Sequence, residues 1–268
     1  MNPSPTPIIE VRDLHLAFGP QRVFEGLNLE VMPGEVLTLI GGSGCGKSVL
    51  LKTILRLLTW QSGTVVVDGE DISDYREDQM LSVRRKVGMV FQNGALFDSL
   101  TVFENLAYPL RERGCDDDAV LAARASEVLE MVGLPGIEHK MPAQLSGGMR
   151  KRVALARAVA EAPKVLLYDE PTTGLDPINV RRISELILDL NRRLQITSLC
   201  VTHDLPSAYM ISDRMAMVAE RRIIEVAKTD ELRHSDNPVV RDFLTAMDSA
   251  TARASGIPPL PAPEPRRP

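Results

Sequence analysis

The stretch VLTLIGGSGCGKS, residues 36–48, decides the fold class of this 268-residue chain. Its first five residues are apolar on both faces, which is typical of a parallel strand that helices cover on each side. The loop that follows fits the pattern G-x-x-x-x-G-K-[ST] over 41–48, and an apolar helical pattern runs over 47–59. A strand, a glycine-rich loop and a helix in this order predict an α/β domain that binds a phosphate group.

Each residue type in the loop has a physical reason to be there. Glycines let the backbone turn tightly, so that successive N–H groups point at one phosphate, and the dipole of the following helix adds positive charge. Lys47 is expected to place its charge against the β- and γ-phosphates of a nucleotide, and the Ser48 hydroxyl to bind Mg²⁺. Cys45 fills a free position of the pattern, so its thiol is not expected to be catalytic. The predicted ATP contacts here are Gly41, Gly42, Ser43, Gly44, Cys45, Gly46, Lys47, Ser48 and Val49.

Short apolar runs alternate with helical patterns along the rest of the chain, which favours a largely parallel sheet. The predicted strands cover 8–12, 27–31, 36–40, 64–68, 87–91, 165–168, 197–201 and 215–219. The predicted helices cover 47–59, 119–132, 146–160 and 178–194. Because no helix separates the strands in 8–31, we expect a small antiparallel layer there. The mostly helical stretch from about 95 to 160 is expected to form an inserted helical subdomain.

A second candidate site follows the apolar run VLLY at 165–168, where two acidic residues end the predicted strand. Beside a phosphate loop, Asp169 is expected to hold Mg²⁺ through water and so to complement Ser48. Glu170 is then placed to polarise an attacking water molecule. The pair predicts a hydrolase rather than a protein that only binds a nucleotide.

The segment LSGGM at 145–149, followed by RKRVALARAVA, connects the chain to a known family. It resembles the signature, usually LSGGQ, of the ATP-binding cassette (ABC) transporter ATPases, a group with the P-loop NTPase fold, and it lies about 24 residues before the Asp-Glu pair. Ser146, Gly147 and Gly148 would expose N–H groups at the start of a helix, which makes a second anion-binding end. The resemblance implies that two chains clamp ATP head-to-tail, with these three residues acting in trans.

Further elements occur in the family's order, so that the resemblance covers roughly residues 8–235. Gln92 resembles the Q-loop residue that reaches Mg²⁺ and the attacking water. His203 resembles the switch histidine that contacts the γ-phosphate, and Asp176, in the segment GLD, resembles the D-loop residue that acts across the dimer interface. Phe18 lies where the family usually has a tyrosine that stacks on adenine, and a phenylalanine ring retains that stacking. The resemblance thus implies catalytic roles for Glu170, His203 and Gln92, and Mg²⁺ binding by Ser48, Gln92 and Asp169.

Two segments resemble one particular subfamily in their detailed residue sequence. FQNGALFDSLTVFENLAYPLRE at 91–112 and LSGGMRKRVALARA at 145–158 are similar to the Mla type of these ATPases, the MlaF and Mkl kind. The resemblance implies phospholipid transport between the inner and outer membrane, a permease that docks near residues 92–112, and an MCE-domain lipid-binding protein in the complex. It also implies a peripheral location at the cytoplasmic face of the inner membrane, and it leaves open a small cytosolic accessory subunit.

Other functions stay open from the residues alone. An ABC importer ATPase for amino acids or other small solutes would carry the same ATP site, because the permease selects the cargo. A soluble ABC ATPase outside transport is a more distant alternative, since such proteins carry long insertions or two cassettes on one chain. A scaffold subunit that does not hydrolyse ATP is disfavoured by the presence of Lys47 and Glu170.

Composition narrows the class further. The chain has 31 Lys and Arg against 36 Asp and Glu, a net charge of −5, which argues against a nucleic-acid partner. Its three cysteines include no CxxC pair, so neither a disulfide framework nor a cysteine zinc site is predicted. No apolar run approaches 18 residues and the start lacks the pattern of a secretory signal, so we expect a reduced, cytosolic chain without a membrane span.

We expect four segments along the chain. They are a flexible N-terminus (1–7), the ABC ATPase domain (8–235), a C-terminal helical extension (236–250) and a proline-rich disordered tail (251–268). The segment NPVVRDFLTAM at 237–247 resembles the extension that the subfamily carries past its core fold. The prolines of the last segment favour an extended backbone rather than a packed one.

Overall fold

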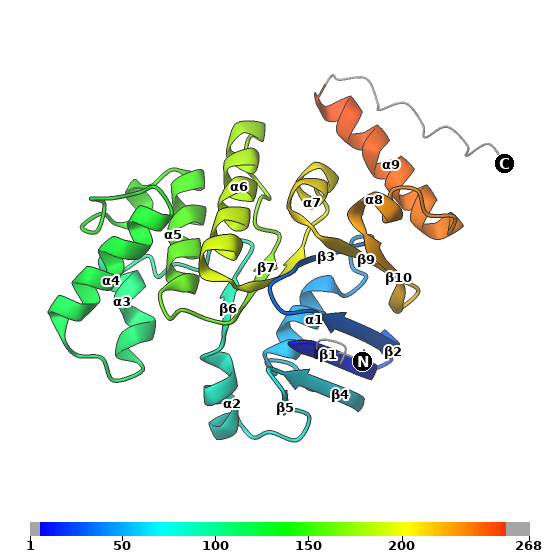
Figure 1. Cartoon of the computed structure of the whole chain (residues 1–268), viewed down its shortest axis with the longest axis horizontal. Coiled ribbons are helices and arrows are strands. Elements are labelled where there is room, and N and C mark those ends of the chain that lie inside the picture. Colours follow the sequence, from blue (N-terminus) through cyan, green and yellow to red (C-terminus); the bar gives the residue numbers. More distant parts are fainter. Residues whose placement is uncertain (1–5, 256–268) are drawn as a thin grey trace, which may run out of the picture.

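The fold is built around a six-stranded sheet in which strands far apart in sequence lie side by side (Figure 1). The computed structural model describes residues 6–255. The strand order is β10-β9-β3-β8-β7-β6, and all neighbours are parallel except β10 and β9. The bounds are β3 Val36–Ile40, β6 Val87–Val90, β7 Val165–Asp169, β8 Thr197–Val201, β9 Arg214–Ala219 and β10 Arg222–Lys228. Every residue of β3, β7 and β8 is buried, as expected for central parallel strands.

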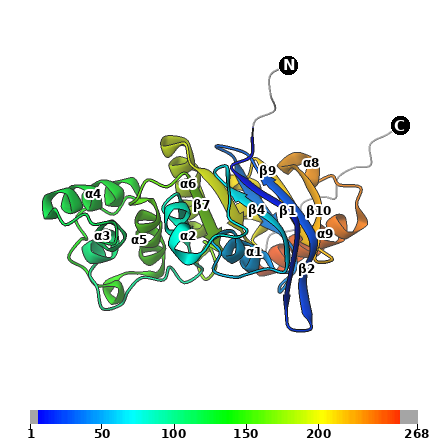
Figure 2. The same cartoon turned by 90° about the horizontal axis from the view of Figure 1, so that it is seen from below.

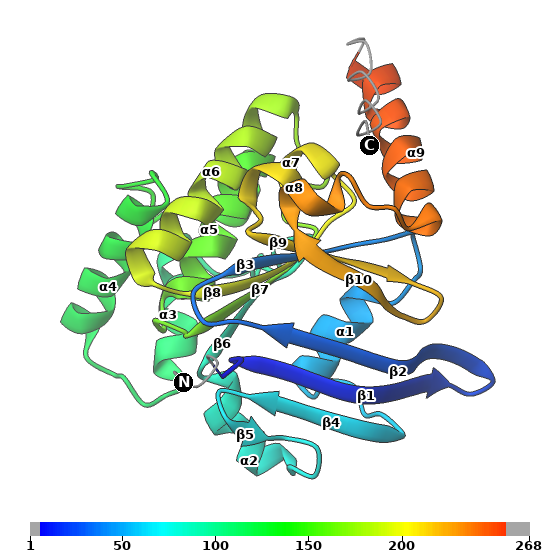
Figure 3. The ribbon, with the colours of Figure 1, turned by 45° about the vertical axis from the view of Figure 1, so that its right-hand side comes forward.

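A second sheet forms the antiparallel layer expected from the early strands (Figure 2). Its order is β2-β1-β4-β5, and all its neighbours are antiparallel. The bounds are β1 Ile9–Phe18, β2 Gln21–Val31, β4 Ser62–Val67 and β5 Glu70–Asp71. Helix α1, Lys47–Ile54, lies between the two sheets (Figure 3) and buries Leu50, Leu51 and Ile54 in an apolar core that both sheets share.

The opposite face of the six-stranded sheet is covered by α6 and α7, while α3, α4 and α5 lie together at one end of the molecule (green, left in Figure 1). Successive side chains of β7 point to opposite faces, so Leu167 joins the α1 core whereas Leu166 and Tyr168 join the core beneath α5 and α6. The bounds are α2 Glu77–Arg84, α3 Val102–Arg111, α4 Asp118–Met131, η1 Pro142–Gln144, α5 Gly147–Val159, α6 Pro177–Leu194, α7 Leu205–Ile211, α8 Thr229–Leu232 and α9 Pro238–Ser255.

The expected fold class, α/β with a mixed sheet and a small antiparallel layer, is confirmed. The predicted helix over 47–59 was too long, because α1 ends at Ile54 and the backbone of Arg56 turns into the left-handed region with a φ of 50°. Strands β5 and β10 and helices α2, α7 and α8 had no prediction. In α2 only Met80 and Val83 are buried, too few apolar contacts for a clear helical pattern.

At the C-terminal end, α9 packs through Val240 and Leu244 against residues of β3 and α7. This helix continues to Ser255, five residues past the expected end of the extension at 250. Residues 256–268 of the predicted disordered tail and 1–5 of the predicted flexible N-terminus lie outside the described residues. The division of the chain into these segments, and of the main domain into a helical subdomain, stays a prediction. Within residues 6–255, none of the helices combines the length and apolar character needed to cross a membrane.

Candidate active site

Most of the predicted site residues meet where parallel strands β3, β7 and β8 end at one edge of the sheet. The loop 41–48 follows β3, Asp169 ends β7 with Glu170 directly after it, and His203 follows β8. The register aligns Leu39 and Asp169 with the same residue of β8, Val201, which brings these three strand ends together. The hollow there is lined by Phe18, Gln21, Val23, Ser43, Gly44, Gly46, Lys47, Ser48, Val49, Gln92, Glu170 and His203.

The N-terminus of α1 opens into this hollow without any side-chain cap. Gly46 is the N-cap residue, with a φ of 102°, and a Cβ atom at this position would collide with Val23 and Phe24. No acidic side chain lies in the first turn. The first N–H groups of a helix have no intrahelical acceptor, so here they are left to bind an anion.

Lys47 supplies a buried positive charge at the same place. Lys47 is only 8% exposed, and its Nζ donates hydrogen bonds to the carbonyl oxygens of Gly41 at 2.8 Å and Gly42 at 3.0 Å. Within the described residues Lys47 has no ion pair with a carboxylate. A buried ammonium without a carboxylate partner fits an anionic ligand such as a nucleotide phosphate. Cys45, which does not line the hollow, lies with its Sγ 3.7 Å from the same Nζ.

Ser48 and Asp169 form a second element at the base of the site. The Ser48 hydroxyl donates to Oδ1 of Asp169 at 2.6 Å, and Asp169 is 7% exposed. One carboxylate plus a hydroxyl suits Mg²⁺, which keeps several waters and takes further oxygens from substrate phosphates. Nowhere in residues 6–255 do three or more His, Cys, Asp and Glu side chains gather as a metal site of their own.

Glu170 and His203 are joined directly, a contact that the sequence did not predict. Oε2 of Glu170 lies 2.8 Å from Nδ1 of His203 and accepts a hydrogen bond from Oγ1 of Thr173 at 3.2 Å. The Glu170 side chain is 13% exposed, whereas that of His203 is 56% exposed. The backbone of Glu170 has a φ of 51°, a conformation that costs about 1–3 kcal/mol for a residue other than glycine and is common at active sites.

Gln92 and Phe18 border the hollow from different elements. The Gln92 residue follows β6, its side chain is exposed, and its main-chain oxygen accepts a hydrogen bond from Lys151 of α5. Phe18 ends β1, is 47% exposed and pairs in register with Gln21 across the β1–β2 hairpin. The sequence analysis missed Gln21 and Val23, which reach the site through strand pairing, and Lys151, which reaches it through helix packing. It also missed Thr173, which lies in the turn three residues after Glu170.

The remaining predicted residues lie elsewhere. Ser146 caps α5 by accepting from the Met149 N–H at 3.2 Å, and Asp176 caps α6 by accepting from the N–H groups of Ile178 at 3.1 Å and Asn179 at 3.0 Å. Both helix starts are close neighbours, since a Cβ on Gly148 would come within 3.0 Å of Oδ1 of Asn179. Ser146, Gly147, Gly148 and Asp176 therefore form a second helix-terminus site, separate from the hollow.

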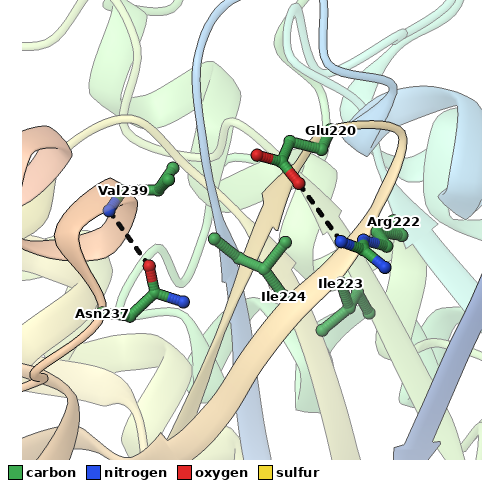
Figure 4. A pocket seen from close by; sticks show the side chains of 6 residues that line it. All are labelled: Glu220, Arg222, Ile223, Ile224, Asn237 and Val239. Atoms are coloured by element: carbon green, nitrogen blue, oxygen red, sulfur yellow. Dashed lines mark hydrogen bonds and ion pairs between the residues drawn. The ribbon is translucent and has the colours of Figure 1, made fainter.

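Another hollow, between β10 and the start of α9, contains none of the predicted site residues (Figure 4). Glu220 and Arg222 form an ion pair at its edge, and Asn237 caps the start of α9 through the N–H of Val239. These contacts explain the local structure without a ligand, so the candidate active site is the hollow at α1.

Comparisons with known proteins show which family the chain resembles. A family model described as "ABC transporter" matches residues 24–173. The chain is 41% identical over 236 residues to the "Probable ribonucleotide transport ATP-binding protein mkl" of Mycobacterium leprae, covering 88% of this chain and 68% of that protein. It is 37% identical over 246 residues to the "Intermembrane phospholipid transport system ATP-binding protein MlaF" of Haemophilus influenzae, covering 92% and 93%. Among solved structures, a dimeric post-hydrolysis state of the ATP-binding cassette MJ0796 bound to ADP and Pi has a TM-score of 0.75 at 32% identity, covering 82% of this chain and 98% of that chain.

Proposed function

Because this chain belongs to the ABC transporter family and is an ABC-type ATPase, we propose that two copies of it bind two ATP molecules head-to-tail and drive phospholipid transport through a membrane permease. The observation that carries the proposal is the pairing of a complete phosphate site at α1 with a separate, incomplete one at α5. Each copy would supply the first to its own nucleotide and the second to its partner's.

Binding is the role of the hollow at α1. The uncapped N–H groups of α1 and the Lys47 ammonium hold the phosphates, and Phe18 stacks on the adenine ring. Ser48, Asp169 and Gln92 are the residues that would hold Mg²⁺, which when bound offsets the charge that develops on the phosphate oxygens. The carbonyl contacts that already orient Lys47 support this role, because they leave it little freedom to lose when ATP binds.

Hydrolysis is the role of Glu170. Its carboxylate accepts a proton from the attacking water, and Nδ1 of His203 and Oγ1 of Thr173 hold the carboxylate in place meanwhile. Gln92, which lines the same hollow, positions the water. The half-exposed imidazole of His203 is accessible to the γ-phosphate, so that the presence of this phosphate is sensed next to the base.

The site is completed by the second copy. Ser146, Gly147 and Gly148 of one copy present the N-terminus of α5 to the γ-phosphate bound by the other, and Asp176 lies beside them at the interface. Because the site forms only when both copies meet, ATP favours the closed pair and hydrolysis releases it. The solved cassette similar to this chain is described as dimeric, which supports this arrangement.

A permease docks on the surface formed by residues 92–112. Phe97 and Tyr108 are each 43% exposed there, with ring centroids 4.8 Å apart. The fully buried Asn105 amide fixes the Phe97 backbone by accepting from its N–H at 2.8 Å and donating to its carbonyl at 3.1 Å. Exposed aromatic side chains held rigidly are typical of protein interfaces.

The lipid cargo rests on similarity alone. The relative named for intermembrane phospholipid transport is matched over almost its whole length. The segments 91–112 and 145–158 also resemble the Mla type in sequence. We therefore propose an MCE-domain lipid-binding protein as a further component, a small cytosolic accessory subunit as an optional one, and the cytoplasmic face of the inner membrane as the location.

One purification tests the proposal. The tagged chain is extracted gently from its native membranes, and the proteins and lipids that accompany it are identified. A permease with an MCE-domain protein and phospholipid is the expected result. Recovery without any membrane protein would contradict a role in transport altogether.

A second candidate function is import of small solutes. It is favoured by the printed name of the mycobacterial relative, which refers to probable ribonucleotide transport. Co-purification of a permease with a solute-binding protein would support this candidate. That result would leave the ATP site as described and contradict only the lipid cargo.

A further inference from the structure

Lys151 lies in the second turn of α5 and contacts the backbone of two residues that line the active site. Lys151 is 8% exposed. Its Nζ donates one hydrogen bond to the main-chain oxygen of Gln92 and another, at 3.5 Å, to that of Glu170. Among residues 6–255, no carboxylate forms an ion pair with it. The side chain therefore joins three elements: α5, the loop after β6 and the end of β7.

Burial of the charged Lys151 ammonium costs free energy, because the group loses its hydration. Loss of water lowers the pKa of the Lys151 ammonium, while the nearby charges of Glu170 and Asp169 raise it again. An apolar side chain would fill the same space without losing hydration. The amine is therefore best explained by its hydrogen bonds, which in the described part of the chain are made only to the backbone of two predicted catalytic residues.

Both of those backbones need an external constraint. Glu170 has a left-handed conformation, which persists only where its surroundings over-determine it. Gln92 follows β6 in a loop, and its exposed side chain has no hydrogen bond of its own in the described part of the chain. Lys151 is anchored on a helix, and it directs the carbonyl groups of both residues toward one fixed point.

We propose that Lys151 is a positioning residue for ATP hydrolysis, which holds Gln92 and Glu170 in the geometry for attack by water. Because it lies five residues after Ser146 on the same helix, it also carries a displacement of α5 to both catalytic residues when α5 engages the partner's nucleotide. This inference rests on the proposed function.

The test compares Lys151→Met with Arg152→Met in the assembled complex. Arg152 is a matched control: it is the next residue of α5 and also donates to carbonyl oxygens, those of Val132 at 3.4 Å and Gly133 at 3.3 Å, away from the active site. For Lys151→Met we expect kcat to fall about 10- to 100-fold, the loss typical of a small misplacement of catalytic groups. The KM for ATP and the melting temperature should stay close to those of Arg152→Met.

Two further variants keep the test decisive. Lys151→Arg retains a cation with N–H donors and should restore most of kcat. Lys151→Gln keeps a donor but no charge and is shorter, so it should lose kcat even if Lys151→Met fails to fold. Near-wild-type kcat for the Gln and Met variants, or an equal loss for Arg152→Met, would overturn the role of Lys151. Absence of ATP hydrolysis by the wild-type complex would instead overturn the proposed function.

Discussion

The molecule has two helix N-termini suited to phosphate, at α1 and at α5, and they differ in almost every other respect. Helix α1 begins at a glycine without a side-chain cap; a buried lysine and Asp169 of β7 adjoin it, and Glu170 lines the same hollow. Helix α5 begins at Ser146, whose hydroxyl already accepts one of the free N–H groups, and no catalytic carboxylate lines it. In the proposed function, the first supplies the base and the residues that would hold Mg²⁺, whereas the second contributes only N–H groups to a bound phosphate.

This difference explains why the chain would act as a pair. A helix terminus binds an anion with its N–H groups, but it neither activates water nor holds a metal. The end of α5 is therefore useful only when it meets a nucleotide bound elsewhere. Four variants test whether the two ends divide the work in this way.

The largest effect is expected for Glu170→Gln. The amide cannot accept a proton, so kcat should fall about 10²–10⁴-fold. ATP binding and ATP-dependent pairing of two copies should persist, because Lys47 and both helix ends are intact. Single-turnover hydrolysis and size-exclusion chromatography with ATP measure both properties. Hydrolysis near the wild-type rate would show that another group is the base.

Lys47→Ala should weaken the binding of ATP at the N-terminus of α1. Loss of charge-assisted hydrogen bonds to phosphate is worth about 1.5–3 kcal/mol, or roughly a 10- to 100-fold rise in the Kd for ATP. Equilibrium binding of a fluorescent ATP analogue to the separate chain measures it. An unchanged Kd would mean that the α1 end is not the primary phosphate site.

Gly147→Asp should leave ATP binding by one chain intact but lower kcat roughly 10- to 100-fold, because a carboxylate at α5 would face the partner's phosphate. Gly147 suits the test better than Gly148, since its Cβ would meet Leu175 at an ordinary 3.8 Å. An acidic residue in the first helical turn also favours the helix, so folding should be retained.

A mixture of Gly147→Asp and Lys47→Ala chains then tests whether the Lys47 and the Gly147 of one ATP site come from two different copies. In a mixed pair, one site combines an intact Lys47 with an intact Gly147 and the other has neither. At an ATP concentration that saturates the wild-type site but not the Lys47→Ala site, activity should return to about a quarter of the wild-type rate, because half of randomly formed pairs are mixed and each has one complete site of two. Failure of the mixture to recover any activity would argue against sites shared between copies.

The smallest effect is expected for Phe18→Ala. Stacking is worth about 0.5–1.5 kcal/mol, so the Kd for ATP should rise roughly two- to tenfold. Phe18→Tyr retains the ring and serves as the control. If the alanine variant bound GTP and ATP with the wild-type affinities, Phe18 would not contact the base.

The sequence by itself determined which local structures form and in what order. A glycine-rich loop, an apolar strand and a capped helix start depend on residues next to one another. The strand VLTLI, the 41–48 loop and the helix start at Ser146 could therefore each be predicted from the local sequence alone. The order of these motifs then indicated the family. Residues without a local pattern, such as those of β10 and α2, gave no comparable signal.

Only the tertiary structure decided how the pieces of the site touch. Ser48 bonds to Asp169 across 121 positions, Glu170 to His203 across 33, and Lys151 to Gln92 across 59. Strand pairing in the six-stranded sheet and the packing of α5 against its end create these contacts, and neither leaves a trace in the spacing of the residues. Propensity and capping act over a few bonds, whereas a catalytic geometry depends on where distant segments are buried together.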